Sequence, residues 1–123
     1  MWENVGIMRT AAGLQAALAD LAVIEGELEA HALADRSRAF NLSWHDWMNL
    51  KSLVEVGRVI AAAALERRDS RGAHFREEFP ESGPLEQSAY TSARMERGTV
   101  AIAMKPVAFT RVKPGETLLR DAA

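Results

Sequence analysis

Cysteine is absent from the 123 residues, which excludes disulfides, thiol nucleophiles and cysteine-ligated zinc or iron–sulfur sites. No apolar run approaches the roughly twenty residues that a membrane-spanning helix needs. The opening residues 1–4 lack the basic and apolar regions that mark a secretory signal. Together these absences predict a cytoplasmic location without direct membrane insertion.

The chain has little excess charge of either sign. Its net charge is -2, with 48% apolar and 26% charged residues, close to the average of soluble globular proteins. No basic face remains once the acids are counted, so we predict no nucleic-acid binding. A chain of this length can bury roughly two thirds of its extended surface. We therefore expect a single domain over residues 1–123.

Apolar spacing predicts one short helix and one long helix in the first third of the chain. Residues 1–8 are typical of a short helix broken near Gly6. Thr10 can cap a longer helix at about Ala11 to Ala32. This helix carries an apolar stripe at three- and four-residue steps, formed by Leu14, Leu18, Leu21, Ile24 and Leu28.

A second long helix is predicted at about Trp44 to Arg68. Ser43 to Asp46 fits a capping box at its start, and Gly72 can supply a left-handed C-cap beyond its end. Arg67 and Arg68 would complement the helix dipole in the last turn. Its apolar seam shrinks from tryptophan to glycine and alanine, through Trp47, Leu50, Val54, Gly57, Ala61 and Ala64.

The pattern changes after the proline- and glycine-containing loop at residues 77–86. Two alternating runs, Tyr90 to Arg94 and Val100 to Met104, flank turn residues and predict a β-hairpin. Residues 105–115 should form an extended arm. The predicted fold class is mainly α: a three-helix, spectrin-repeat-like bundle at about 1–76, followed by the loop, hairpin and arm at about 77–123. An isolated piece of this kind could bury its open face in a homodimer.

A dense run of charge at residues 67–80 lies where the second long helix stops. It contains four arginines, Arg67, Arg68, Arg71 and Arg76, with His74 among them and acids beside them. Three explanations fit such a cluster. It could bind an anion or move a proton, it could be a loop held by ion pairs to Asp69, Glu77 and Glu78, or it could position an interface with another domain. Buried charged hydrogen bonds contribute more than exposed ion pairs, which favours the interface.

Sequence motifs for catalysis, metal binding or nucleotide binding are absent. His31, His45 and His74 have no zinc-binding spacing, Ser70 lies in no G-x-S-x-G turn, and the glycines form no G-x-G-x-x-G. Trp44 and Trp47 could form a stacking platform, the wide end of the core or a partner-facing surface. We accordingly assign no catalytic, cofactor-binding or metal-binding residues to the chain.

Three motifs carry a family resemblance across almost the whole chain. The first is Ser70-Arg71-Gly72-Ala73-His74-x-Arg76 followed by Phe79-Pro80, the second is Met1-Trp2-x-x-Val5-Gly6-Ile7-x-Arg9, and the third is Lys105-Pro106-Val107-x-Phe109-Thr110-x-Val112-x-Pro114. The chain resembles the C-terminal domain of the succinate dehydrogenase/fumarate reductase flavoprotein subunit, which L-aspartate oxidase shares. Asp69 stands where that family usually has glutamate.

This resemblance implies a helical bundle docked on a flavin-binding domain, in a parent protein that interconverts succinate and fumarate or oxidises a related dicarboxylate. FAD and substrate would bind to upstream domains, and an iron–sulfur subunit could adjoin them and hold the assembly near a membrane. Ser70, Arg71, Gly72, His74 and Arg76 are the expected interface residues. The alternatives are a free-standing helical interaction protein or small subunit without catalysis, and a small-molecule binder with a closed apolar pocket.

Overall fold

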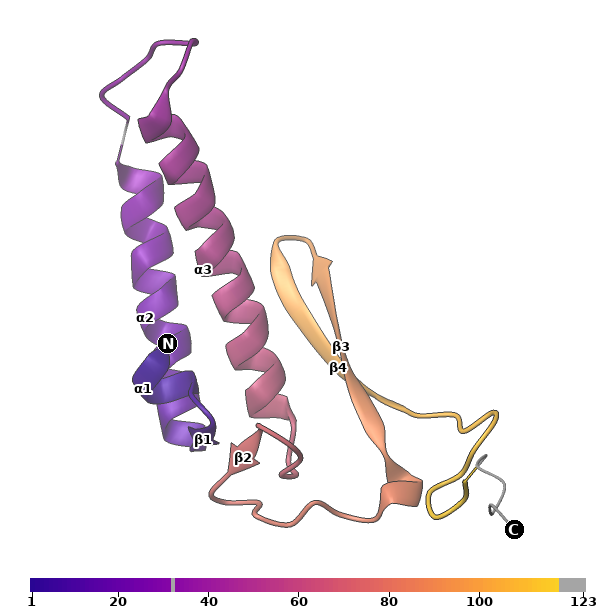
Figure 1. Ribbon diagram of the computed structural model, residues 1–123. Helices are drawn as coiled ribbons and strands as arrows, with labels where there is room; N and C mark the ends of the chain where they lie inside the picture. Colours follow the sequence, from indigo (N-terminus) through magenta and orange to yellow (C-terminus); the bar gives the residue numbers. More distant parts are fainter. Residues whose placement is uncertain (32, 118–123) are drawn as a thin grey trace.

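Two long antiparallel helices and a β-hairpin dominate the computed structural model, which describes residues 1–31 and 33–117 (Figure 1). The helices are α1 (Trp2–Val5), α2 (Ala11–Ala30) and α3 (Leu42–Glu66), and a 3-10 turn covers Leu85–Gln87. The strands are β1 (Met8–Arg9), β2 (Phe75–Arg76), β3 (Ala89–Glu96) and β4 (Thr99–Pro106). The short strands β1 and β2 pair in parallel, with Arg9 opposite Arg76.

The core lies at the end of the helical hairpin where α1 crosses α2. Leu14 is fully buried there, in a cluster with Val5, Ala17, Ala61 and Ala64. Gly57 lies among the small residues of α3 because an added Cβ would come within 3.4 Å of the Leu21 methyl groups. The predicted seam is therefore confirmed in its second half, whereas Leu50 is exposed. The predicted α2 stripe is buried only in part, because Ile24 is also exposed.

The helix α3 begins and ends two residues before the predicted range of about Trp44 to Arg68, and the predicted capping box was wrong. The N-cap is Asn41 rather than Ser43, and its Oδ1 accepts a hydrogen bond of 2.8 Å from the Trp44 backbone N–H. Asparagine is as good an N-cap as serine, and Asn41 also donates to the Asp35 and Ser37 carbonyls of the preceding connection. At the other end the helix stops at Glu66, so Arg67 and Arg68 lie beyond its last turn.

The start of the chain follows the prediction more closely. The short helix α1 ends at Val5, just before Gly6, and the Thr10 hydroxyl caps α2 by accepting from the Gly13 N–H at 3.0 Å. The predicted last residue of α2, Ala32, lies outside the described residues. The structure ends this helix at Ala30, where the backbone of His31 becomes extended.

The C-terminal hairpin is confirmed, with longer strands than predicted. β3 and β4 pair antiparallel from Ala89 opposite Pro106 to Glu96 opposite Thr99. Arg97 and Gly98 both have positive φ at the turn, as a two-residue type I′ turn requires. Figure 1 shows the hairpin beside α3, and Val56 and Val59 share a groove with Met95 and Val100. Residues 107–117, beyond β4, form no helix or strand.

The predicted fold class holds in its coarser form. The described residues contain three α-helices with a C-terminal β-hairpin, so the domain is rich in helix. However, α1 is a single turn and the hairpin adds two eight-residue strands. The fold is therefore a mixture of helix and strand rather than mainly α. No helix among the described residues is long and apolar enough to cross a membrane.

Candidate functional site

A tight turn forms the tip of the charged run. Arg71 and His74 exchange both backbone hydrogen bonds, at 2.9 and 3.0 Å, across Gly72 and Ala73. Gly72 has φ +56, a conformation that glycine adopts without the steric penalty of a side chain. The positive φ of Gly72 therefore belongs to this turn. The prediction that Gly72 supplies the C-cap of α3 was wrong. We call residues 67–79 the corner.

Arg76 takes over the capping of α3. Its side chain is 2% exposed, and its Nη1 donates to the carbonyl oxygens of Ala64, Leu65 and Arg67 at 2.9 to 3.1 Å. Its Nε donates to Glu78 Oε2 at 3.2 Å. A guanidinium has the fixed fork of donors and the positive charge that the carbonyl end of a helix attracts. A side chain ten residues beyond the helix thus donates to the last carbonyls of α3. In a glycine C-cap, backbone N–H groups would make these hydrogen bonds.

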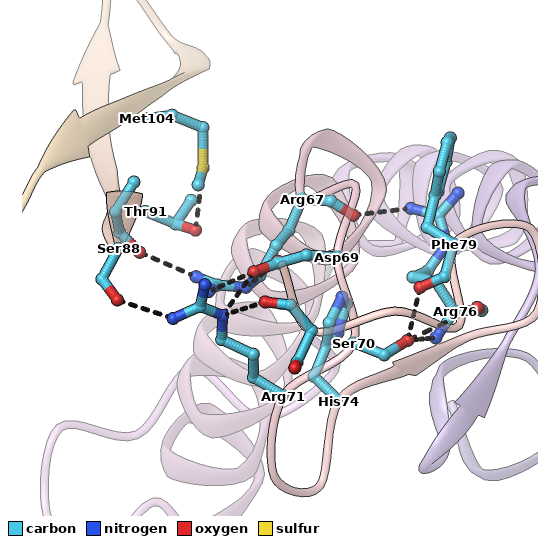
Figure 2. A network of polar contacts seen from close by, with 12 residues as sticks. Arg67, Asp69, Ser70, Arg71, His74, Arg76, Phe79, Ser88, Thr91 and Met104 are labelled. Carbon is cyan, nitrogen blue, oxygen red and sulfur yellow. Dashed lines mark hydrogen bonds and ion pairs between the residues drawn. The ribbon is translucent and has the colours of Figure 1, made fainter. Parts of the chain in front are cut away.

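Ser70 closes the corner from inside. This residue is buried, and its Oγ accepts from the Arg76 backbone N–H at 2.8 Å while donating to the Phe79 carbonyl at 2.7 Å (Figure 2). Its own N–H donates to the Glu81 carbonyl at 3.0 Å. A hydroxyl suits this position because it donates and accepts at once. Ser70 is therefore a link between two parts of the same loop.

Arg71 connects the corner to the hairpin. Its guanidinium donates to the carbonyls of Ser82 and Pro84 and, at 2.7 Å, to the Ser88 hydroxyl just before β3. Asp69 lies between two cations, with its oxygens 2.7 Å from Arg67 Nε and from Arg71 Nε. Arg67 also donates to the Ala89 carbonyl at 3.1 Å. Figure 2 shows these side chains bridging the end of α3 and the base of the hairpin.

His74 is a neutral member of the cluster. Arg9 Nη1 donates to His74 Nδ1, and because a guanidinium can only donate, the ring proton lies on Nε2. Burial, and then the positive charges of Arg9, Arg67 and Arg76, lower the pKa of His74. The backbone of Arg67 opposes this shift of the pKa by favouring the charged ring, and Nε2 makes no hydrogen bond with any described residue.

The lowered pKa of His74 predicts that acid weakens the fold. The ring has a lower pKa in the folded chain than the value of about 6.5 expected after unfolding, so below that pH the unfolded chain binds more protons. The free energy of unfolding should therefore fall as the pH is lowered from 7.5 to 5.5. In urea titrations at these two pH values, His74→Gln should show a smaller fall, since it keeps an acceptor for Arg9. An equal fall in both chains would contradict the prediction.

Two contacts of the cluster were missing from the sequence-based assignment. Arg9 reaches the corner because β1 pairs with β2, and Glu78 reaches α2, where its Oε1 accepts from the first helical N–H, that of Ala11, at 2.5 Å. This bond, first, and the nearby Arg76 lower the pKa of Glu78. Both contacts join residues more than sixty positions apart, and two-residue strands give no periodic signal.

Five predicted site residues come together, although they play different parts. Ser70 and Arg76 are buried, Arg71 and His74 are half-buried, and Gly72 is exposed at the tip. Their assignment to a domain interface stays a prediction. The three histidines do not converge, and residues 1–31 and 33–117 contain no group of three metal-binding side chains. Trp47 packs on α2 and donates to the Leu28 carbonyl at 3.2 Å, so it belongs to the helical contact.

An open concavity of about 740 Å³ lies at the α2–α3 connection. Its walls include Phe40, Leu42 and Trp44, which are all exposed, with Arg36 and Arg38 beside them. Phe40 has φ +52, an uncommon conformation for a bulky residue. The end of the helical hairpin at the α2–α3 connection is thus an apolar surface.

Solved structures of two longer chains contain a domain similar to this one. FrdA of Escherichia coli quinol fumarate reductase, solved as a mutant, matches with a TM-score of 0.84 at 28% identity, over 94% of this chain and 20% of that chain. The Mycobacterium smegmatis Sdh1 complex in the apo form matches with a TM-score of 0.73 at 30% identity, over 86% and 18%. The class is therefore a helix-rich domain that forms about a fifth of such longer chains.

Residues 1–118 match the family model described as the fumarate reductase flavoprotein C-term. The chain belongs to this family, which confirms the resemblance seen in its motifs. The fumarate reductase flavoprotein subunit of Mycobacterium tuberculosis is 32% identical over 90% of the chain. L-aspartate oxidase 1 of Ralstonia nicotianae is 37% identical over 68%. The chain spans only 19% and 15% of the length of these two relatives, respectively.

Proposed function

We propose that the chain is a structural and docking domain of a flavoprotein that interconverts succinate and fumarate or oxidises a related dicarboxylate. The corner carries this proposal, because its polar side chains join separate parts of one chain. Arg76 holds α3, Glu78 holds α2, and Arg71 holds the hairpin. A cluster that links three separate elements in this way is suited to fixing a surface. FAD and the dicarboxylate would bind to other segments of the parent protein.

Exposed apolar side chains support docking. Trp2 is 92% exposed and Phe40 100%, and Ile7 and Met8 are exposed beside the corner. Large apolar groups in water favour burial against a partner. We propose that Ser70, Arg71, Gly72, His74 and Arg76 shape the face that meets the flavin-binding domain. In this arrangement residues 1–123 act as one unit, with α1 as the third helix of a spectrin-repeat-like bundle.

The family resemblance also implies partners and a cellular location for the parent protein, and the proposal includes them. The parent protein would hold FAD, an iron–sulfur subunit would adjoin it, and the assembly would be cytoplasmic and membrane-peripheral through partner subunits. The chain alone would bind neither FAD nor metal. Released from its parent, the chain would cover its apolar face by forming a homodimer.

Two measurements test the proposal. The purified chain mixed with FAD and succinate should show no bound-flavin spectrum and no reduction of an electron acceptor. The same chain should form a complex with the flavin-binding portion of the Mycobacterium tuberculosis fumarate reductase flavoprotein subunit, made without its C-terminal fifth, as measured by calorimetry. Turnover by the chain alone would contradict the first part, and absence of a complex would favour a free-standing interaction protein.

A further inference from the structure

Arg9 is a cation without a matching acid. It is half-buried, yet among the residues that the structure describes no carboxylate lies within 4.0 Å of its guanidinium. The other buried or half-buried arginines all have one. Those pairs are Arg58 with Glu25, Arg67 and Arg71 with Asp69, and Arg76 with Glu78. The described arginines that share the lack of an acid with Arg9 are exposed to water.

The surroundings of Arg9 disfavour its charge. Burial, and then the nearby Arg76, lower the pKa of Arg9. Its Nε donates to the carbonyls of Gly6 and Val5, and its Nη1 donates to His74. A guanidinium has five N–H donors. Nη2 makes no hydrogen bond to any described residue, so part of a rigid, oriented donor fork is left open.

Arg9 borders an open concavity of about 400 Å³. The concavity is also lined by Arg67, Arg71 and His74, and by Ile60, Ala63, Ala64 and Thr91. Three arginines, Arg9, Arg67 and Arg71, line the concavity, and Arg67 and Arg71 share the single carboxylate of Asp69. Because the imidazole of His74 accepts from Arg9, it orients the guanidinium without neutralising it. The concavity is therefore positively charged, with an apolar wall from α3.

We propose that this concavity receives an aspartate or glutamate side chain from the flavin-binding portion of the parent protein, held by the fork of Arg9. The inference rests on the proposed function. Guanidinium and carboxylate match as two parallel hydrogen bonds, and such pairs are strong where water is excluded. A protein surface fits better than a free anion, because exposed Ile7, Met8 and Ile60 around Arg9 would be covered at the same time.

The experiment compares Arg9→Gln with Arg68→Gln by calorimetry against the flavin-binding portion of the Mycobacterium tuberculosis subunit. Both changes remove one positive charge, but Arg68 is exposed and does not line the concavity. Losing a hydrogen bond to a charged group should weaken binding about 10- to 100-fold for Arg9→Gln. Arg68→Gln should change the affinity less than about threefold. Arg9→Lys, which keeps the charge without the fork, should lie between them.

The outcomes separate the two proposals. If the unmodified chain forms no complex, the docking function itself is wrong. If the chain binds and Arg9→Gln behaves like Arg68→Gln, docking stands and the carboxylate site is overturned. Urea unfolding of each variant shows whether it is folded. If Arg9→Gln is not folded, the affinity of Arg9→Lys relative to the unmodified chain tests the carboxylate site instead. An Arg9-dependent rise in the melting temperature of the isolated chain with succinate would assign the site to a free carboxylate and overturn the proposed source.

Discussion

Replacing Arg76 with alanine is expected to lower the free energy of unfolding by about 3–5 kcal/mol. Three carbonyls at the end of α3, those of Ala64, Leu65 and Arg67, accept from its Nη1. Removing a donor from buried acceptors costs about 1–3 kcal/mol for each group left without a partner. Domains of this size are stable by about 5–15 kcal/mol, so the variant should be close to unfolding at 37 °C.

Urea unfolding followed by circular dichroism measures this effect, with an unchanged m-value showing that the same surface is exposed. Arg68→Ala is the matched control, because Arg68 is exposed at the same end of α3 and should change stability by no more than about 0.5 kcal/mol. Arg76→Lys keeps the charge but cannot reproduce the planar fork, so it should still lose most of the stability that Arg76→Ala loses. A loss below about 1 kcal/mol for Arg76→Ala would show that α3 is capped in another way.

The motif at Ser70 to Arg76 could be found from the sequence, but the direction of its side chains could not. Charge density and the family pattern both marked the stretch. Nothing local shows that Arg76 folds back over α3, because the carbonyls that it meets are a backbone feature of every helix end. The prediction that Gly72 caps α3 failed for this reason: the cap was supplied by a side chain ten residues downstream.

Long-range pairing explains the other omission. Arg9 was quoted only as part of the opening motif, yet β1 places it opposite Arg76. Strands of two residues have no alternation to read, and their partner is set by how α1 and α3 pack. The hairpin, by contrast, was predictable because its alternating runs and its Arg97-Gly98 turn are adjacent in the sequence.

Replacing Leu14 with alanine is expected to lower the free energy of unfolding by about 2–5 kcal/mol. Leu14 is 0% exposed, and it packs with Val5 of α1, Ala17 of α2, and Ala61 and Ala64 of α3. Truncating a buried leucine loses transfer free energy and leaves a cavity that small neighbours cannot fill. Val23→Ala on the same helix is the control, since Val23 is 63% exposed and should change stability by no more than about 0.5 kcal/mol.

The two large losses should not add. Ala64 contributes its methyl group to the cluster around Leu14 and its carbonyl to Arg76, so the core and the corner share one turn of α3. Loosening that turn with Leu14→Ala already weakens the Arg76 bonds, so the double variant should lose at least about 0.5 kcal/mol less than the sum of the single losses. Strict additivity in a double-mutant cycle would mean that the corner is held independently of the core. Non-additive losses would mean that the core and the corner stabilise each other through this turn of α3.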